Sequence, residues 1–204
     1  MKIRNKLVQY IFLELMMLCL SCVQEKQAPE KQGLSIQVIE ENKLVVYQVF
    51  TRLFGNTNTT NKPWGTIEEN GVGKFNDFTE RALQEIKNLG VTHIWYTGIP
   101  HHDVITDYTK YGISSDDPDI VKGRAGSPYA VKDYYNVNPD LAENVEQRLE
   151  EFQALIKRTH EAGLKAIIDI VPNHVARNYH SISKPEVIRD FGEDDDISVV
   201  YHVN

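Results

Sequence analysis

Two helical patterns in this chain each end in Gly and lead directly into an apolar strand pattern, and this alternation constrains the fold most. Strand patterns rich in β-branched and aromatic residues cover residues 44–54, 91–99 and 164–171, and amphipathic helix patterns cover 75–89 and 145–162. Gly90 and Gly163 supply the helix stops. Strand, helix, strand, helix, strand in this order requires parallel pairing through right-handed crossovers. We therefore predict an α/β fold.

The third strand pattern ends at Pro172 and is followed directly by Asn173 and His174. Ligands of parallel α/β folds bind beyond the carboxyl ends of the strands, so both residues are candidates for a binding site. Each also has a purely structural interpretation. His174 can cap the end of the strand, and Asn173 can be a turn amide that bonds its own backbone.

The stretch from residue 100 to residue 143 fits the alternation poorly, because so long a loop is uncommon in a compact domain. It is rich in Tyr, whose rings either stack on sugars or pack in a core, and composition leaves both readings open. We interpret His101-His102-Asp103 as a polar loop rather than a metal site. We interpret the acidic residues Asp116, Asp117 and Asp119 as a solvated loop.

The first 22 residues are of a different kind. A basic start precedes a mostly apolar stretch at residues 7–20, and Ser21-Cys22 resembles a bacterial lipoprotein processing site. We predict a signal peptide at 1–22, lipidation of Cys22 and a polar tether at 23–43, which together imply an exported lipoprotein anchored to a membrane, in the periplasm or at the cell surface. The alternative is an uncleaved membrane anchor, for which the apolar run is short.

Composition restricts the class of partner. The chain has 204 residues, of which 41% are hydrophobic, enough for one domain with a real core. Its net charge of −7 argues against nucleic acid as the main partner.

Four segments, in this order, resemble the α-amylase family of glycoside hydrolases (family 13). They are Val45–Phe50, Asn88–Trp95, Pro128–Tyr134 and Asp169–His174, which resemble the first strand, the entry to the second, a loop motif and the segment at the end of the third strand. The resemblance implies a (β/α)8 TIM barrel, with its first three strands in residues 44–174 and the start of a B-domain excursion in 175–204. It also implies retaining hydrolysis of α-glucans such as starch, glycogen and maltooligosaccharides.

The resemblance assigns roles to three residues. His174 is expected to hydrogen-bond the sugar at the cleavage subsite, and Tyr129 to stack on that ring. Asn173 matches the position that supplies an oxygen to a structural calcium ion, a cation that prefers oxygen ligands. Asp169 is expected to be structural, with its carboxylate bonded to loop backbone.

The family's catalytic carboxylates belong to later strands, and no residue here matches them. We therefore expect the chain to be truncated and inactive by itself, with the side chains of Val45, Val49, Ile94, Ile167 and Ile168 lying open on the inward face. The alternative function is that of a non-catalytic surface lipoprotein that only binds glucans. A carboxylate pair on further barrel strands would decide between the two.

Overall fold

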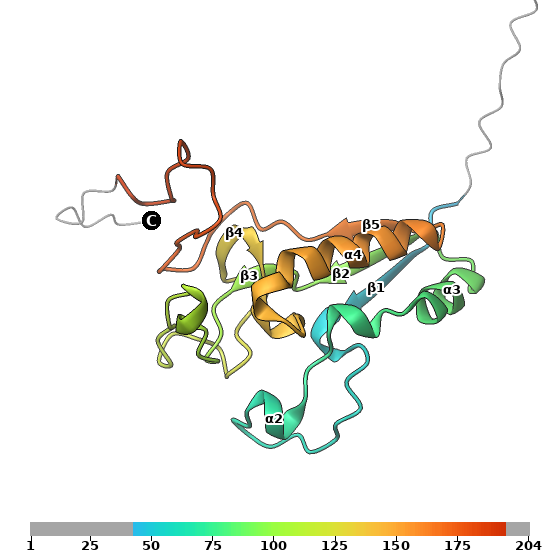
Figure 1. The fold of residues 1–204 in the computed structure, drawn as a ribbon, viewed down its shortest axis with the longest axis horizontal. Coiled ribbons are helices and arrows are strands. Elements are labelled where there is room, and N and C mark those ends of the chain that lie inside the picture. The colour runs from blue at the N-terminus through green and yellow to red at the C-terminus, as the bar shows by residue number, and fades with distance from the viewer. Residues whose placement is uncertain (1–42, 195–204) are drawn as a thin grey trace, which may run out of the picture. The chain divides into compact units, whose positions relative to one another are not determined.

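The structure is a computed structural model that describes residues 43–194 (Figure 1). The predicted signal peptide, the lipidation site Cys22 and most of the predicted tether lie outside the described residues. The predicted excursion at 175–204 is described as far as residue 194.

The main sheet has three parallel strands in the order β1-β2-β5, as the sequence predicts. The strands are β1 (Val46–Phe50), β2 (His93–Thr97) and β5 (Lys165–Ile168). Each lies inside a predicted strand pattern and is shorter, because ladder hydrogen bonds, rather than apolar composition, set its ends. The register aligns Val49 with Tyr96 and Tyr96 with Ile168.

Helices α3 (Glu80–Asn88) and α4 (Arg148–Glu161) pack against this sheet (Figure 1). The helix predicted at 75–89 begins later than expected. Residues Phe75–Asp77 form a separate 3-10 turn, and α3 starts where the Thr79 side chain accepts a hydrogen bond from the Ala82 amide at 3.2 Å. Thr79 is therefore the N-cap, a role for which Thr is well suited.

The apolar core lies between the helices and the sheet. Phe78 is fully buried, stacks on Phe54 with ring centroids 4.0 Å apart and meets the Tyr96 ring edge-on at 5.1 Å. Val49 is 8% exposed and Ile94 is 0% exposed. The expectation that these two side chains lie open was wrong, because the strand alternation turns them toward the helices.

The segment between β2 and α4 is not the loop that the sequence suggested. Strands β3 (Pro100–His102) and β4 (Val131–Val137) pair antiparallel in it, with register shifts around His101. His101 and His102 are each 2% exposed, so the interpretation of this stretch as a polar loop was wrong. Burial lowers the pKa of His101 to about 3, which keeps the imidazole neutral.

Asp116 also departs from its predicted place in a solvated loop. Its carboxylate pairs with Lys132, and both side chains are 2% exposed. It further accepts hydrogen bonds from the Val104 amide at 2.9 Å and from Asn178 Nδ2 at 2.8 Å. Asp116 therefore organises a polar core that ties the hairpin to the segment after β5.

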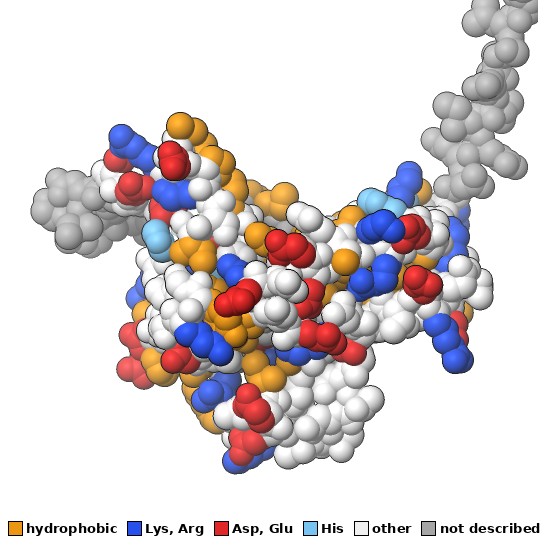
Figure 2. All heavy atoms as spheres, in the orientation of Figure 1, with side chains coloured by type: hydrophobic (Ala, Val, Ile, Leu, Met, Phe, Trp, Pro, Cys, Tyr) orange, Lys and Arg blue, Asp and Glu red, His pale blue; other side chains and the backbone are white. Residues whose placement is uncertain are grey.

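The remaining elements are short. Helix α2 spans Ile67–Asn70, and 3-10 turns span Thr51–Leu53, Thr109–Tyr111, Pro139–Leu141 and Val145–Gln147. Over residues 43–194, no helix has the length and apolar character needed to cross a membrane. Figure 2 shows acidic and basic side chains interspersed over the visible face of the described part.

Candidate substrate-binding site

The three parallel strands end at the same edge of the sheet, and the residues predicted to contact substrate follow that edge. Asn173 and His174 lie just past β5, in the order that the sequence predicts. Across β1 and β2, Gln48 Nε2 donates a hydrogen bond to Thr97 Oγ1 at 3.1 Å. This edge therefore carries polar side chains on β1 and β2 and in the segment that follows β5.

Trp95 and Asp169 join β2 to the end of β5. The Trp95 indole N–H donates to Asp169 Oδ1, while Asp169 Oδ2 is buried without a hydrogen-bond partner among the described residues. Burial raises the pKa of this carboxyl group. Asp169 was expected to bond loop backbone, and the structure gives it a side-chain partner instead.

His174 is exposed, and its Nδ1 lies 3.1 Å from Asn173 Oδ1. With Nδ1 protonated, the imidazole donates this bond and leaves Nε2 free for a ligand. Both residues line a cavity of about 800 Å³ along β5. Its other walls are mainly aliphatic and aromatic, and they include Ile168, Ile170, Tyr134, Tyr135, Tyr179 and Phe191.

Tyr129 lies in a different cavity. It is 47% exposed and, with Gln48, Phe50, Thr97 and Pro128, lines a space of about 400 Å³ over the ends of β1 and β2. The structure therefore places the two predicted sugar contacts along the same edge of the sheet but does not bring them into one cavity.

Asn173 meets the requirements of a calcium site only in part. Its amide oxygen suits the cation, but calcium takes about six to eight oxygen ligands, and here the oxygen faces His174 Nδ1. Within residues 43–194, no three His, Cys, Asp or Glu side chains are grouped so that they could hold a metal ion. The described residues do not make a complete calcium site.

Asp169 is the one acidic side chain that lines the cavity beside His174 in the described part of the chain. Retaining glycoside hydrolysis needs two carboxyl groups, about 5–5.5 Å apart, flanking the bond. The geometry supports binding and orientation of a ligand here, and the described residues that line the cavity provide no pair of acids.

Sequence reasoning missed the aromatic walls contributed by Tyr179 and Phe191. Their rings meet edge-on with centroids 5.0 Å apart, and the Tyr134 hydroxyl donates to the Val171 carbonyl beside them. The only signal was their proximity to His174 in sequence, which does not by itself show that they fold back toward β5.

Comparison with known proteins identifies the family. The α-amylase catalytic domain family matches residues 48–195. This match covers most of the chain and contains β2, β5 and the last three residues of β1. The chain therefore belongs to the α-amylase family of glycoside hydrolases, and β1, β2 and β5 are the first three strands of its (β/α)8 barrel.

Two relatives illustrate the similarity. Trehalose-6-phosphate hydrolase from Bacillus subtilis is 27% identical over 140 residues, which cover 67% of this chain and 18% of the relative. Maltase A1 from Drosophila melanogaster is 25% identical over 149 residues, which cover 71% of this chain and 20% of the relative. The chain thus spans about a fifth of the length of these relatives.

Among solved structures, an α-amylase from Lactobacillus plantarum is 31% identical, with a TM-score of 0.44. The matched part covers 66% of this chain and 24% of that protein.

Proposed function

We propose that these residues belong to an α-amylase-type retaining glycoside hydrolase that acts on α-glucans, and that they form one side of its substrate-binding edge. The observation that carries the proposal is the position of Asn173 and His174, which follow the end of β5 by five and six residues, on the edge where β1 and β2 also end. Family membership supports the reaction class, because the relatives include a maltase and a pullulanase.

Each proposed contact follows from the chemistry of its side chain. Positive charge develops on the sugar ring in the transition state, and polar contacts to its hydroxyl groups strengthen there. His174 Nε2 is the group that we assign to such a hydroxyl. The half-exposed ring of Tyr129 offers a flat face to the C–H groups of a sugar.

We assign binding, without cleavage, to the 204-residue chain by itself. An oxocarbenium-like transition state requires both protonation of the leaving group and capture of the sugar carbon. Asp169 alone cannot do both, and Trp95 already holds one of its oxygens. The second candidate is a non-catalytic glucan binder, which is favoured because Asp169 is the one acid among the described residues that line the cavity.

The test is calorimetric titration of the 204-residue chain with maltotriose, together with an assay for reducing sugar released from starch. We expect measurable binding that His174→Ala weakens by about tenfold, and no release of sugar. The variant His160→Ala is the control, because His160 is exposed on α4, away from the site. Cleavage that disappears with Asp169→Asn would refute the non-catalytic assignment.

We also propose that Asn173 supplies one oxygen to a structural calcium ion, with the other ligands lying outside the described residues. Titration of the chain with calcium should then show heat that Asn173→Leu removes and that Asn88→Leu, at an exposed position on α3, does not. Calcium binding of equal strength in the parent chain and Asn173→Leu would exclude this role.

Finally, we propose that Cys22 is lipidated and anchors the exported protein to a membrane. The basic start, the apolar stretch and the Ser21-Cys22 pair support the proposal. Cells that express the chain should incorporate labelled fatty acid into it, and Cys22→Ala should lose the label while Cys19→Ala keeps it. Equal labelling of the parent and Cys22→Ala would rule out the anchor.

A further inference from the structure

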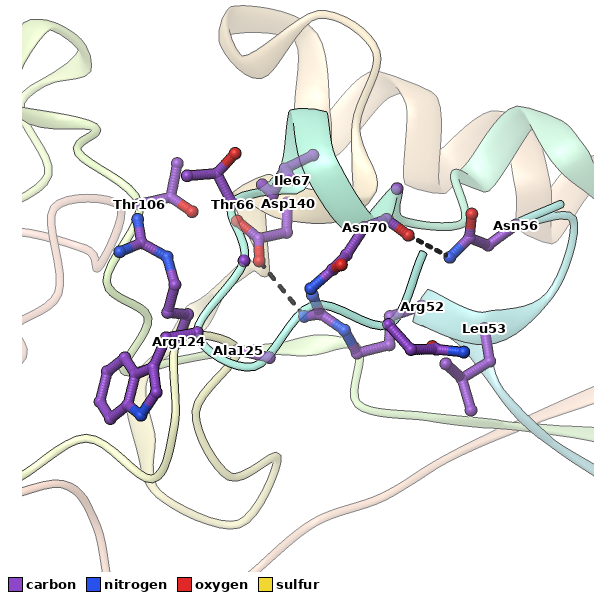
Figure 3. Close-up of a pocket in the computed structure, with 14 residues that line it drawn as sticks. Arg52, Leu53, Asn56, Thr66, Ile67, Asn70, Thr106, Arg124, Ala125 and Asp140 are labelled. Carbon is purple, nitrogen blue, oxygen red and sulfur yellow. Dashed lines mark hydrogen bonds and ion pairs between the residues drawn. The ribbon is translucent and has the colours of Figure 1, made fainter. Parts of the chain in front are cut away.

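A separate cavity of about 260 Å³ lies beyond the end of β1, and neither His174 nor Tyr129 lines it (Figure 3). Its walls come from the loop after β1, from α2 and from the segment between β3 and β4. Amide, hydroxyl and guanidinium groups dominate these walls, with Trp64 among the lining residues. This volume is below the ~300 Å³ at which drug-sized pockets begin, so it suits a single small ring.

Trp64 is held in a conformation that Trp seldom adopts. Its φ angle is 57°, and it follows Pro63 in a turn closed by a 2.9 Å hydrogen bond from the Gly65 amide to the Lys62 carbonyl. A turn with Pro at its second position and positive φ at its third is type II, and that third position favours Gly or Asn. A bulky side chain there is strained. The fold keeps Trp64 there with 62% of its surface exposed.

The turn is fixed by side-chain amides rather than left free to relax. The Asn70 amide spans the Lys62 backbone, with its Oδ1 accepting from the Lys62 amide at 2.7 Å and its Nδ2 donating to the Lys62 carbonyl at 2.9 Å. Asn56 Nδ2 donates to the Asn70 carbonyl at 3.1 Å, and Asn58 Nδ2 donates to the Glu69 carbonyl at 3.0 Å. Such bracing lowers the entropy lost when a ligand stacks on Trp64.

Arg124 supplies unused hydrogen-bond donors to the same cavity. Figure 3 shows its guanidinium beside Thr106, whereas Arg52 extends toward Asp140, with which it forms an ion pair at 3.2 Å. Among the described residues, no acceptor forms a hydrogen bond or ion pair with the Arg124 guanidinium. A guanidinium has five donors and no acceptor, so it matches ligands rich in oxygen.

The charges around the cavity favour a neutral ligand over an anion. The Asp140 carboxylate neutralises Arg52. Glu68 and Glu69 lie close enough for the Arg124 charge to contribute to the lowering of their pKa values, after the larger effects of hydrogen bonds from Thr66 and Lys62. An incoming anion would therefore meet carboxylates as well as the guanidinium.

We propose that Trp64 and Arg124 form a second saccharide subsite, in which a glucosyl ring stacks on the indole and its hydroxyl groups accept hydrogen bonds from the guanidinium. The inference rests on the strained, braced and exposed Trp64, which lines the same cavity as the unpaired guanidinium donors of Arg124 in the described part of the chain. An aromatic face combined with a few polar groups is the usual way to hold a sugar ring. The choice of an α-glucan rests on the proposed function, whereas the subsite itself rests on the cavity.

The experiment uses the 204-residue chain with His174→Ala, so that the site past β5 contributes little, and titrates it by calorimetry with maltotriose and with cellotriose. Adding Trp64→Ala should weaken maltotriose binding by about tenfold, whereas Trp64→Phe, which keeps an aromatic face, should change it by less than about threefold. Arg124→Gln should weaken it by about threefold to tenfold.

Trp64→Gly separates binding from folding, because Gly accepts the positive φ without strain. It should weaken maltotriose binding by about tenfold, as Trp64→Ala does, while its melting temperature equals or exceeds that of the chain with Trp64. A melting temperature that falls together with binding would contradict the proposal.

The outcomes separate this inference from the proposed function. Binding of cellotriose but not maltotriose, with the same Trp64 dependence, would support the subsite and count against an α-glucan enzyme. Maltotriose binding that ignores Trp64, absence of binding to either saccharide, or displacement of maltotriose by inorganic phosphate would each overturn the subsite. The comparison between the parent chain and His174→Ala would still test the site past β5.

Discussion

The molecule has two buried regions that are held together by different physical means. Between the sheet and helices α3 and α4, the core is apolar, with Phe75, Phe78, Leu83 and Ile94 all 0% exposed. The segment between β2 and α4 also buries apolar side chains, but it adds eight ionic or polar ones, namely His101, His102, Asp103, Lys132, Asp133, Asn136, Asn138 and Asp140. The first region positions the strands, and the second fixes the loops that carry Tyr129 and Arg124.

This difference implies different sensitivities. An apolar core loses stability according to the volume of the cavity that a deletion leaves behind. A polar core is sensitive to the removal of single partners, because each unpaired charge or donor left inside is costly. The following predictions test this contrast.

The largest effect is expected from Phe78→Ala in the apolar core. Phe78 is fully buried and contacts Phe54 and Tyr96 through its ring, so its truncation leaves a cavity. The free energy of unfolding, measured by urea denaturation, should fall by about 3–5 kcal/mol. Phe191→Ala, at a side chain that is 63% exposed, should change it by less than about 0.5 kcal/mol.

A comparable loss is expected when Lys132→Met breaks the ion pair of the polar core. The Asp116 carboxylate would stay buried without its cation, which costs about 3–5 kcal/mol in similar cases. The double variant Lys132→Met with Asp116→Asn should recover part of this loss, because the amide is neutral and its oxygen still accepts from the Val104 amide. Equal instability of the single and double variants would show that charge is not the cause.

The polar core should also make stability depend on pH through Asp103. Burial, followed by repulsion from Asp116, raises the pKa of Asp103 to about 6, above its ordinary 3.8. Between these values the folded state binds more protons than the unfolded state, so the contribution of Asp103 to stability falls as pH rises from about 4 to 6. The loss is on the order of 1–3 kcal/mol.

Asp103→Asn should remove this decline, since the amide does not titrate. The measurement is the difference in unfolding free energy between the parent chain and Asp103→Asn, followed across that pH range. A difference that stays constant with pH would mean that Asp103 titrates alike in the folded and unfolded chains.

The smallest effect is a difference between two Tyr hydroxyl groups. Tyr108 donates to Asp140 Oδ1 at 2.8 Å in the polar core, whereas the Tyr96 hydroxyl lies 2.6 Å from Thr159 Oγ1 under the sheet. A bond to a carboxylate is worth more than one to a neutral group. Tyr108→Phe should therefore destabilise the chain by about 1 kcal/mol more than Tyr96→Phe does. The reverse order in chemical denaturation would contradict the contrast.

The same contrast explains what the sequence predicts well. The three strands and their parallel order were predicted correctly, because apolar β-branched runs such as Ala166–Ile168 indicate a strand by composition alone. The burial predicted for the third strand was wrong, since none of the side chains of β5 is buried. The family was predicted from four short segments, and the match over residues 48–195 confirmed it. The face of the sheet on which a side chain lies could not be predicted in the same way, because near-continuous apolar runs show no alternation. Val49 and Ile94 were therefore assigned to the wrong face.

The polar core lay outside the reach of sequence patterns. His101, Asp103 and Asp116 read as loop residues because their burial depends on partners distant in sequence, such as Lys132 and Asn178. The site past β5 was located from its place in the chain. The cavity beside Trp64 was not predicted. The Pro-Trp-Gly turn among Asn residues is a signal that could have indicated an exposed aromatic ring there.

The central claim is that His174 contacts an α-glucan from its position past β5. The most direct measurement is nuclear magnetic resonance of the 204-residue chain with ¹³C-labelled histidine, assigned with His174→Gln and titrated with maltotriose. The ring signal of His174 should shift as maltotriose saturates the chain, while that of His160 on α4 should not. An unchanged His174 signal at saturating maltotriose, with the sugar bound elsewhere on the chain, would contradict it.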